Sequence, residues 1–173
     1  MFRMTAPQSS VLLGVVVLAV VLVSLLLSFI KKKGAQRYYL LFIVVTMVLG
    51  LGYLFFYAPS KVVVSLTEDD LQVAIPPFVK ESWVYEDISK AYIADWTTAE
   101  NEGLRPAQRT MGTAVGEYRT GWFQLANGQK ALLMVNGSRF ICLETPSELL
   151  ILAPDDFEGF RLALESKLGC EIQ

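Results

Sequence analysis

Side chains that could carry catalytic chemistry are scarce in this sequence. It contains no histidine, which removes Ser-His and Cys-His nucleophilic pairs, histidine-ligated metals and a histidine pH switch. Cys142 and Cys170 are the only cysteines; they are too few for a thiolate-only zinc site or a disulfide framework, and whether they pair is left open. The sequence also lacks a nucleophile elbow and a phosphate-binding loop. We therefore expect no enzymatic activity, no catalytic residue and no cofactor.

Three acids in the middle of the chain raise the question of a cation site. Asp95, Glu100 and Glu102 lie within eight positions of one another. Their spacing lacks the alternating acids and the central glycine of a calcium-binding loop. The pattern is more typical of a solvated loop, so we expect no metal site.

Arginine and aromatic residues between 105 and 122 are the candidates for contact with a partner. Their side chains could line one face of a folded domain and meet an acidic ligand. Alternatively the arginines are solvated and pair with Glu100, Glu102 or Glu117, and such surface pairs contribute little stability. The candidate contact residues are Arg105, Arg109, Tyr118, Arg119 and Trp122.

Four basic residues form a cluster between two apolar stretches, with no acid near them. They are Lys31, Lys32, Lys33 and Arg37. Short loops rich in Lys and Arg stay on the cytoplasmic side of a membrane during insertion. We interpret the four as topology anchors that place the loop 31–37 in the cytoplasm. A specific site for anionic lipid is the alternative, and charge alone supports it.

The two apolar stretches predict transmembrane helices over residues 11–30 and 38–57. Each is a run of twenty residues without a charge, and about 20 helical residues cross the hydrocarbon core of a bilayer. A cleaved signal peptide is the alternative for the first run. That run exceeds the usual apolar length of a signal peptide and lacks small residues for cleavage at its end. We therefore expect a helical hairpin over 11–57, preceded by an N-terminal tail over 1–10.

Charge divides the chain at the end of the second apolar run. Residues 1–57 carry five basic residues and no acid, whereas residues 58–173 carry ten basic and seventeen acidic residues, a formal charge of −7. Acids contribute little to membrane orientation, and long domains translocate largely regardless of charge. With the loop 31–37 in the cytoplasm, the acidic domain is expected on the extracytoplasmic side.

The residues after the second apolar run predict one compact, mainly β domain over 60–170. Segments rich in β-branched or alternating apolar residues end at turn signals such as Asn127-Gly128 and Asn136-Gly137. Residues 97–113 have little periodicity and predict either a long loop or a loop with a poorly coded strand near Arg109. The predicted strands are 61–66, 70–75, 82–85, 88–96, 117–125, 130–136, 139–145 and 148–153.

The period changes near the C-terminus, where residues 154–168 predict a helix. Phe157, Phe160, Leu164 and Leu168 fall on one helical stripe, so this helix should cover part of the strand assembly. Antiparallel strands in a meander followed by one amphipathic helix give a pleckstrin-homology-like (PH-like) layout, a bent barrel capped by a C-terminal helix.

The same region resembles the bacterial PH domain family found after transmembrane helices. The resemblance covers roughly 60–170 and lies in turns and core positions. It implies the fold, a membrane tether and a bacterial inner membrane, but no agreed biochemical activity. The matching positions are Arg109 and Gly112, Gly121 and Phe123, Asn127-Gly128, Ile141, Leu143 and Thr145, and Pro154-Asp155.

These observations favour a non-enzymatic, membrane-tethered module that docks a protein partner, whose identity the sequence does not give. We expect no nucleic-acid partner. Comparison with phosphoinositide-binding PH domains points to the loop 67–70, TEDD, whose acids would repel a phosphate. The alternative function is a sensor or carrier of a lipid or small apolar ligand in the barrel interior. Its lining would come from aromatic residues, which more often form core: Phe78, Trp83, Tyr85, Trp96 and Trp122.

Overall fold

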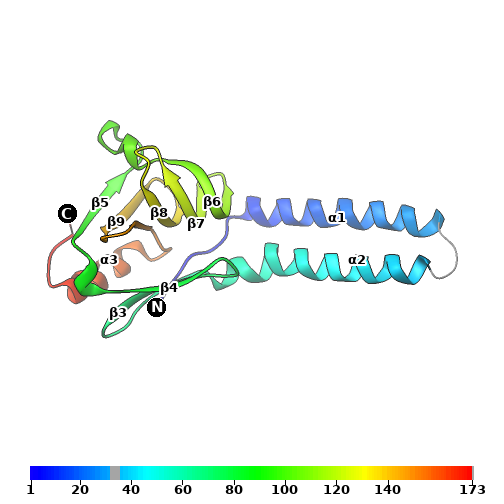
Figure 1. Ribbon diagram of the computed structural model, residues 1–173, viewed down its shortest axis with the longest axis horizontal. Coiled ribbons are helices and arrows are strands. Elements are labelled where there is room, and N and C mark those ends of the chain that lie inside the picture. Colours follow the sequence, from blue (N-terminus) through cyan, green and yellow to red (C-terminus); the bar gives the residue numbers. More distant parts are fainter. Residues whose placement is uncertain (32–35, 173) are drawn as a thin grey trace. The chain divides into compact units, whose positions relative to one another are not determined.

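The computed structural model describes residues 1–31 and 36–172 (Figure 1). The chain forms two compact units. One consists of Ala6–Ser60, and the other combines Met1–Thr5 with Lys61–Gln173. The residues on both sides of the apolar hairpin therefore belong to the same domain.

The first unit is a pair of helices that lie side by side, α1 (Gln8–Lys31) and α2 (Gln36–Gly52) (Figure 1). A π-helical turn η1 (Tyr53–Tyr57) and a 3-10 turn η2 (Ala58–Lys61) continue α2. Gly14 allows the close approach of the two arms, because a Cβ there would lie 2.8 Å from the Cβ of Phe55.

Two segments of this unit are long and apolar enough to cross a membrane, Gln8–Leu27 and Tyr38–Lys61. They overlap the predicted spans 11–30 and 38–57. Of the four predicted topology anchors, Lys32 and Lys33 lie outside the described residues, and the side chains of Lys31 and Arg37 are not described either. The topology prediction therefore stays a prediction.

The second unit begins with a four-stranded antiparallel sheet, in the order β1-β2-β3-β4. Alternation along its strands separates a buried face from an open one. Val64, Leu71 and Val73 are fully buried, whereas Ser65 and Gln72 point the other way. The strands are β1 (Phe2–Arg3), β2 (Val63–Leu66), β3 (Asp70–Ile75) and β4 (Val79–Val84).

A six-stranded sheet makes up most of the domain, in the order β5-β9-β10-β8-β7-β6. All its pairings are antiparallel except that of β10 with β8, which is parallel. Its strands are β5 (Lys90–Asp95), β6 (Pro106–Val115), β7 (Tyr118–Leu125), β8 (Lys130–Asn136), β9 (Arg139–Glu144) and β10 (Leu149–Leu152).

Both faces of the middle strands of this sheet are buried. One face carries a cluster that includes Trp96, Phe123, Leu133 and Phe140, with the rings of Trp96 and Phe140 4.7 Å apart. The side chains on the opposite face of the same strands are equally inaccessible to solvent. They include Leu132, Met134, Ile141, Leu143, Leu150 and Leu152, all with 0% exposure.

The C-terminal helix α3 (Phe157–Leu168) buries Phe160 and Leu164. It begins three residues later than predicted, because Asp156 serves as its N-cap and accepts a hydrogen bond from the backbone N–H of Gly159 at 3.0 Å. Gly169, in the left-handed conformation, ends the helix. The ring of Phe160 lies edge-on to Phe2 of β1, with centroids 5.4 Å apart.

Two expectations about the domain were wrong. Strand pairing forms two separate sheets in the described part of the chain rather than a closed barrel, since β4 and β5 are edge strands of different sheets. The strands are not a simple meander, because β10 inserts between β9 and β8. Residues 97–113 follow the alternative with a strand near Arg109: a 3-10 segment η4 (Ala99–Leu104) leads into the ten-residue strand β6, which is longer than that alternative suggested.

The predicted tail over 1–10 is also structured. Phe2 and Arg3 pair with Val64 and Val63 in the sheet. Met4 is 2% exposed, and Asp155 accepts hydrogen bonds from the N–H and the hydroxyl of Thr5 at 2.9 and 2.6 Å. The start of the chain is thus an integral part of the domain core.

Candidate interaction surfaces of the domain

Arg105, the first predicted contact residue, ties two segments of the domain together. Its Nε and Nη2 atoms donate to the backbone oxygen of Trp96 at 3.1 and 2.9 Å. The indole N–H of Trp96 in turn donates to the backbone oxygen of Leu104 at 2.9 Å. An exposed pair with Glu102 at 3.7 Å adds little. These contacts give Arg105 a structural role.

Three predicted contact residues lie on β7 but not on one face. Tyr118 and Trp122 are 1% and 5% exposed and point to the side opposite Arg119, because neighbouring strand positions alternate. The guanidinium of Arg119 lies 5.3 Å from the ring centroid of Trp96. The structure therefore does not bring the predicted set together, and alternation along 118–125 was the signal that could have shown it.

Arg109 is the predicted contact residue that the structure leaves accessible. It is exposed on β6 opposite Phe123. Its guanidinium has no hydrogen-bond or ion-pair partner within residues 1–31 and 36–172. An unpaired cation on an acidic domain is free to meet an anionic group of a partner.

A cluster that was not predicted contains two tryptophans and an ion pair. Trp83 of β4 donates its indole N–H to Glu148 at 3.1 Å. Lys130 of β8 lies 3.8 Å from the same carboxylate and 3.6 Å from the ring centroid of Trp122. The cluster connects the two sheets. Its members come from segments up to 65 positions apart, so no local sequence pattern marks it.

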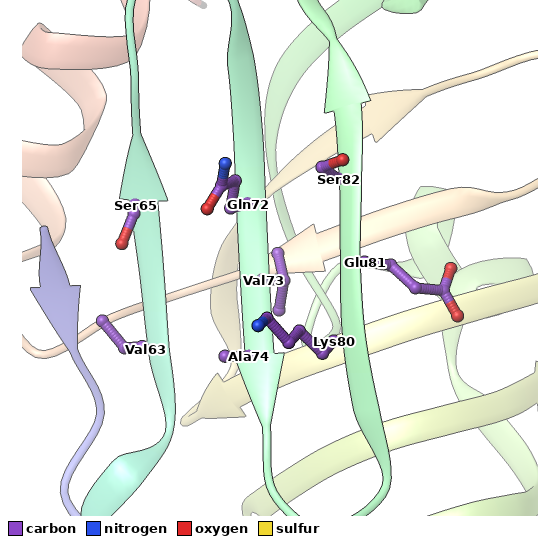
Figure 2. A pocket seen from close by; sticks show the side chains of 8 residues that line it. All are labelled: Val63, Ser65, Gln72, Val73, Ala74, Lys80, Glu81 and Ser82. Atoms are coloured by element: carbon purple, nitrogen blue, oxygen red, sulfur yellow. The ribbon is translucent and has the colours of Figure 1, made fainter.

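The open face of the four-stranded sheet carries a shallow groove of about 500 Å³ (Figure 2). The hydroxyls and amide of Ser65, Gln72 and Ser82 and the ammonium of Lys80 lie on this face of adjacent strands. Val63 and Ala74 supply apolar surface between them. Alternation in 61–66 and 70–75 is the signal that could have identified the outward positions on β2 and β3.

Local hydrogen bonds lower the pKa of two acids at the edges of the domain. The hydroxyl of Thr67, followed by the amide of Gln72, lowers the pKa of Asp70. The hydroxyl and backbone N–H of Thr97, both 2.7 Å away, lower the pKa of Asp95. Asp70 therefore stays ionised in the acidic loop 67–70, which makes this loop unfavourable for a phosphate.

Burial has the opposite effect on two groups of the core. It raises the pKa of the Cys142 thiol to about 11 and also raises the pKa of Tyr118. Cys142 is buried and Cys170 is exposed, and both are free thiols. Among the described residues, no three His, Cys, Asp or Glu side chains are grouped to hold a metal ion. The inert environment of Cys142 indicates a packing role.

Comparison with known proteins identifies the domain. A family model described as bacterial PH domain matches residues 62–168, which spans β2 to the end of α3. Comparisons with curated proteins and with solved structures give no match. The glycines of the matched region occupy defined structural positions: Gly112 and Gly121 face each other on β6 and β7, and Gly128 turns the hairpin between β7 and β8. The chain therefore belongs to the bacterial PH domain family.

Proposed function

We propose that this protein is a non-enzymatic integral membrane protein whose helical hairpin holds the PH domain at the membrane, where the domain docks a protein partner. Membership of the PH domain family supports a protein or lipid interaction module. The two apolar helices support the tether by their length and composition. The expected location is the bacterial inner membrane.

The observation that carries the tether is the return of both hairpin ends to one domain. Residues 1–5 and 61–173 form a single unit, and the backbone N–H of Asp155 donates to the oxygen of Arg3 at 3.0 Å. Two spans place their outer ends on the same side of a bilayer, which agrees with a domain that both ends share. The basic loop 31–37 then lies on the opposite, cytoplasmic side.

Cys170 is a natural reporter for this topology because it is exposed on the domain. A membrane-impermeant maleimide applied to intact cells should label Cys170 in the full-length protein. A cysteine placed in the loop 31–37 of a Cys170→Ser variant should react only after the membrane is permeabilised. The reverse pattern of labelling would refute the proposed orientation.

Charge supports a protein as the partner in preference to an anionic lipid surface. The segment 58–173 has a formal charge of −7, and three of its acids, Glu68, Asp69 and Asp70, lie together between β2 and the start of β3. Attraction to an anionic leaflet requires several basic residues at the surface, each worth about 1 kcal/mol. The groove with Lys80 offers mixed polar and apolar surface, which suits contact with another protein.

The carrier alternative gains no support from the core. The sites that an apolar ligand would need are occupied by side chains such as Phe123, Leu133 and Phe140. Of the five aromatic residues considered for a lining, Trp83, Trp96 and Trp122 are buried within the packed core, so a ligand would have to displace them.

Site-specific photo-crosslinking tests partner docking in the native membrane. A photoreactive residue at Gln72 or Ser82, both in the groove, should form an adduct with a protein of defined mass. The same residue at Leu162, which is 57% exposed on α3, serves as the matched control. The adduct should disappear with Lys80→Glu. Adducts to lipid alone, or equal adducts at Leu162, would contradict docking through this face.

A further inference from the structure

The strand β6 leaves one edge of the six-stranded sheet unpaired. It pairs with β7 only, and within the described residues positions 107–115 form no other backbone hydrogen bond. Residues 107–111 are all exposed, including the apolar side chain of Met111 at 42%. An open edge of this length is a template for an added strand unless the chain interrupts it.

Interruptions are confined to the first half of the strand. Irregular register occurs between Pro106 and Gln108 and between Arg109 and Met111, and such bulges block edge pairing. From Met111 to Val115 the register with β7 is continuous. This window, MGTAV, has no charged residue.

Opposite charges flank the window at equal sequence distance from its centre. Arg109 lies four residues before Thr113, and Glu117 lies four residues after it, in the two-residue turn that follows β6. Both side chains are exposed. Neither the guanidinium nor the carboxylate has a hydrogen-bond or ion-pair partner among residues 1–31 and 36–172, so both are available to a neighbour.

We infer that β6 pairs with β6 of a second copy of this chain, antiparallel and two-fold symmetric about Thr113. In a two-residue hairpin the closing pair, Val115 and Tyr118, is hydrogen-bonded, so alternate residues direct their backbone groups to the free edge. These are Gly112 and Ala114. In the proposed register Gly112 lies opposite Ala114 of the second copy, and Ala114 lies opposite Gly112 of the second copy. The backbone N–H and C=O groups of both residues are then hydrogen-bonded in both copies.

The flanking charges make this arrangement self-complementary. Antiparallel pairing about Thr113 puts Arg109, which lies just beyond the irregularity before Met111, at the same end of the contact as Glu117 in the turn of the second copy, and symmetry repeats this combination at the other end. Met111 lies beside Val115 of the second copy, and Thr113 beside its own counterpart, a favourable cross-strand combination. A second copy satisfies both flanking charges at once, which is why we choose it over an unrelated strand.

Disulfide crosslinking at the symmetry axis tests the contact in the full-length, membrane-inserted protein. Directly opposed residues at a non-hydrogen-bonded position have Cα atoms about 4.5 Å apart, within the range of a disulfide. In a Cys170→Ser background, Thr113→Cys should give a covalent dimer on mild oxidation. Ser147→Cys, at an exposed position outside β6, is the control. A dimer yield no higher than this control would overturn the proposal.

Charge exchange distinguishes self-pairing from any other occupant. Arg109→Glu and Glu117→Arg should each weaken the Thr113→Cys dimer about tenfold, because two cross-strand pairs become like-charged. The double variant should restore it. Co-expression of the two single variants under different tags should give the mixed dimer, because all its flanking pairs are then complementary.

The mixed dimer also controls for misfolding, since each single variant must be folded to form it. Failure of both the double variant and the mixture would overturn the self-pairing. If no adduct forms at Gln72 but the Thr113→Cys dimer does, partner docking through the groove is refuted and the self-pairing of β6 stands. The two proposals can therefore fail separately.

Discussion

Gly112 and Gly121 lie directly opposite each other on β6 and β7, and each occupies backbone space that a side chain would need. A Cβ on Gly112 would lie 2.0 Å from the backbone oxygen of Thr120, and one on Gly121 would lie 2.2 Å from that of Met111. Both glycines have positive φ, 132° and 109°. Gly112 and Gly121 are among the positions that match bacterial PH domains, and the lack of space for a side chain explains why both are glycine.

Replacing Gly121 with alanine should destabilise the domain strongly. The substitution adds a backbone clash to an unfavourable φ, and we expect a loss of about 2–4 kcal/mol in the free energy of unfolding. Gly128→Ala is the matched control, because Gly128 has φ of 85° but nothing within 4 Å of a Cβ. Chemical denaturation followed by tryptophan fluorescence measures both. Equal losses would show that the close approach of β6 and β7 is unimportant.

Phe160→Ala should create a cavity beneath α3. Phe160 is 0% exposed, and truncation of a buried phenylalanine costs about 3–5 kcal/mol. Leu162→Ala on the same helix should change stability by less than about 0.5 kcal/mol, because surface substitutions usually have small effects and Leu162 is 57% exposed. The denaturation midpoints of the two variants give the comparison. A loss at Phe160 below about 1 kcal/mol would not fit a buried position.

Phe2 and Phe160 should be energetically coupled. Their edge-on contact at 5.4 Å predicts a coupling energy of about 0.5–1.5 kcal/mol in a double-mutant cycle of Phe2→Ala and Phe160→Ala. The matched cycle of Phe2→Ala with Leu162→Ala should show none. Additive losses in the first cycle would mean that β1 does not dock against α3.

Sequence patterns predicted the strands that are buried on both faces and those whose apolar and polar residues alternate regularly. β2, β3 and β7 to β10 lie within or close to their predicted ranges, because β-branched residues and Asn-Gly turns are local signals. The pairing of β10 is different, since its position between β8 and β9 depends on long-range packing. A short turn at Pro146-Ser147 predicted the antiparallel neighbour β9 but not the parallel neighbour β8.

The elements that were missed, or offered only as an alternative, have weak local patterns for physical reasons. β6 is an edge strand with two irregularities, so its exposed residues do not alternate with buried ones. β1 has two residues, too few for any periodicity to appear. The candidate contact residues do not share one face because Tyr118 and Trp122 are core residues, and the alternation along β7 is the signal that separates them from Arg119.

The two cysteines should differ sharply in reactivity. At pH 8 a small aromatic disulfide reagent should modify Cys170 alone in the native protein and both thiols after denaturation, because Cys142 is buried. Burial raises the pKa of Cys142 to about 11 from an ordinary 9.0, so the folded state binds its proton more tightly than the unfolded state. The protonated Cys142 thiol therefore makes its full contribution to the free energy of unfolding below about pH 9.

As the pH rises from about 9 to 11, that stability should fall by about 2–3 kcal/mol, since each pKa unit corresponds to about 1.4 kcal/mol. Tyrosines titrate in the same range, so the measurement compares variants. Cys142→Ala should be less stable at pH 8 but lose less stability between pH 8 and 11 than the parent, whereas Cys170→Ser should follow the parent. Parallel curves for Cys142→Ala and the parent would show that Cys142 titrates alike in both states.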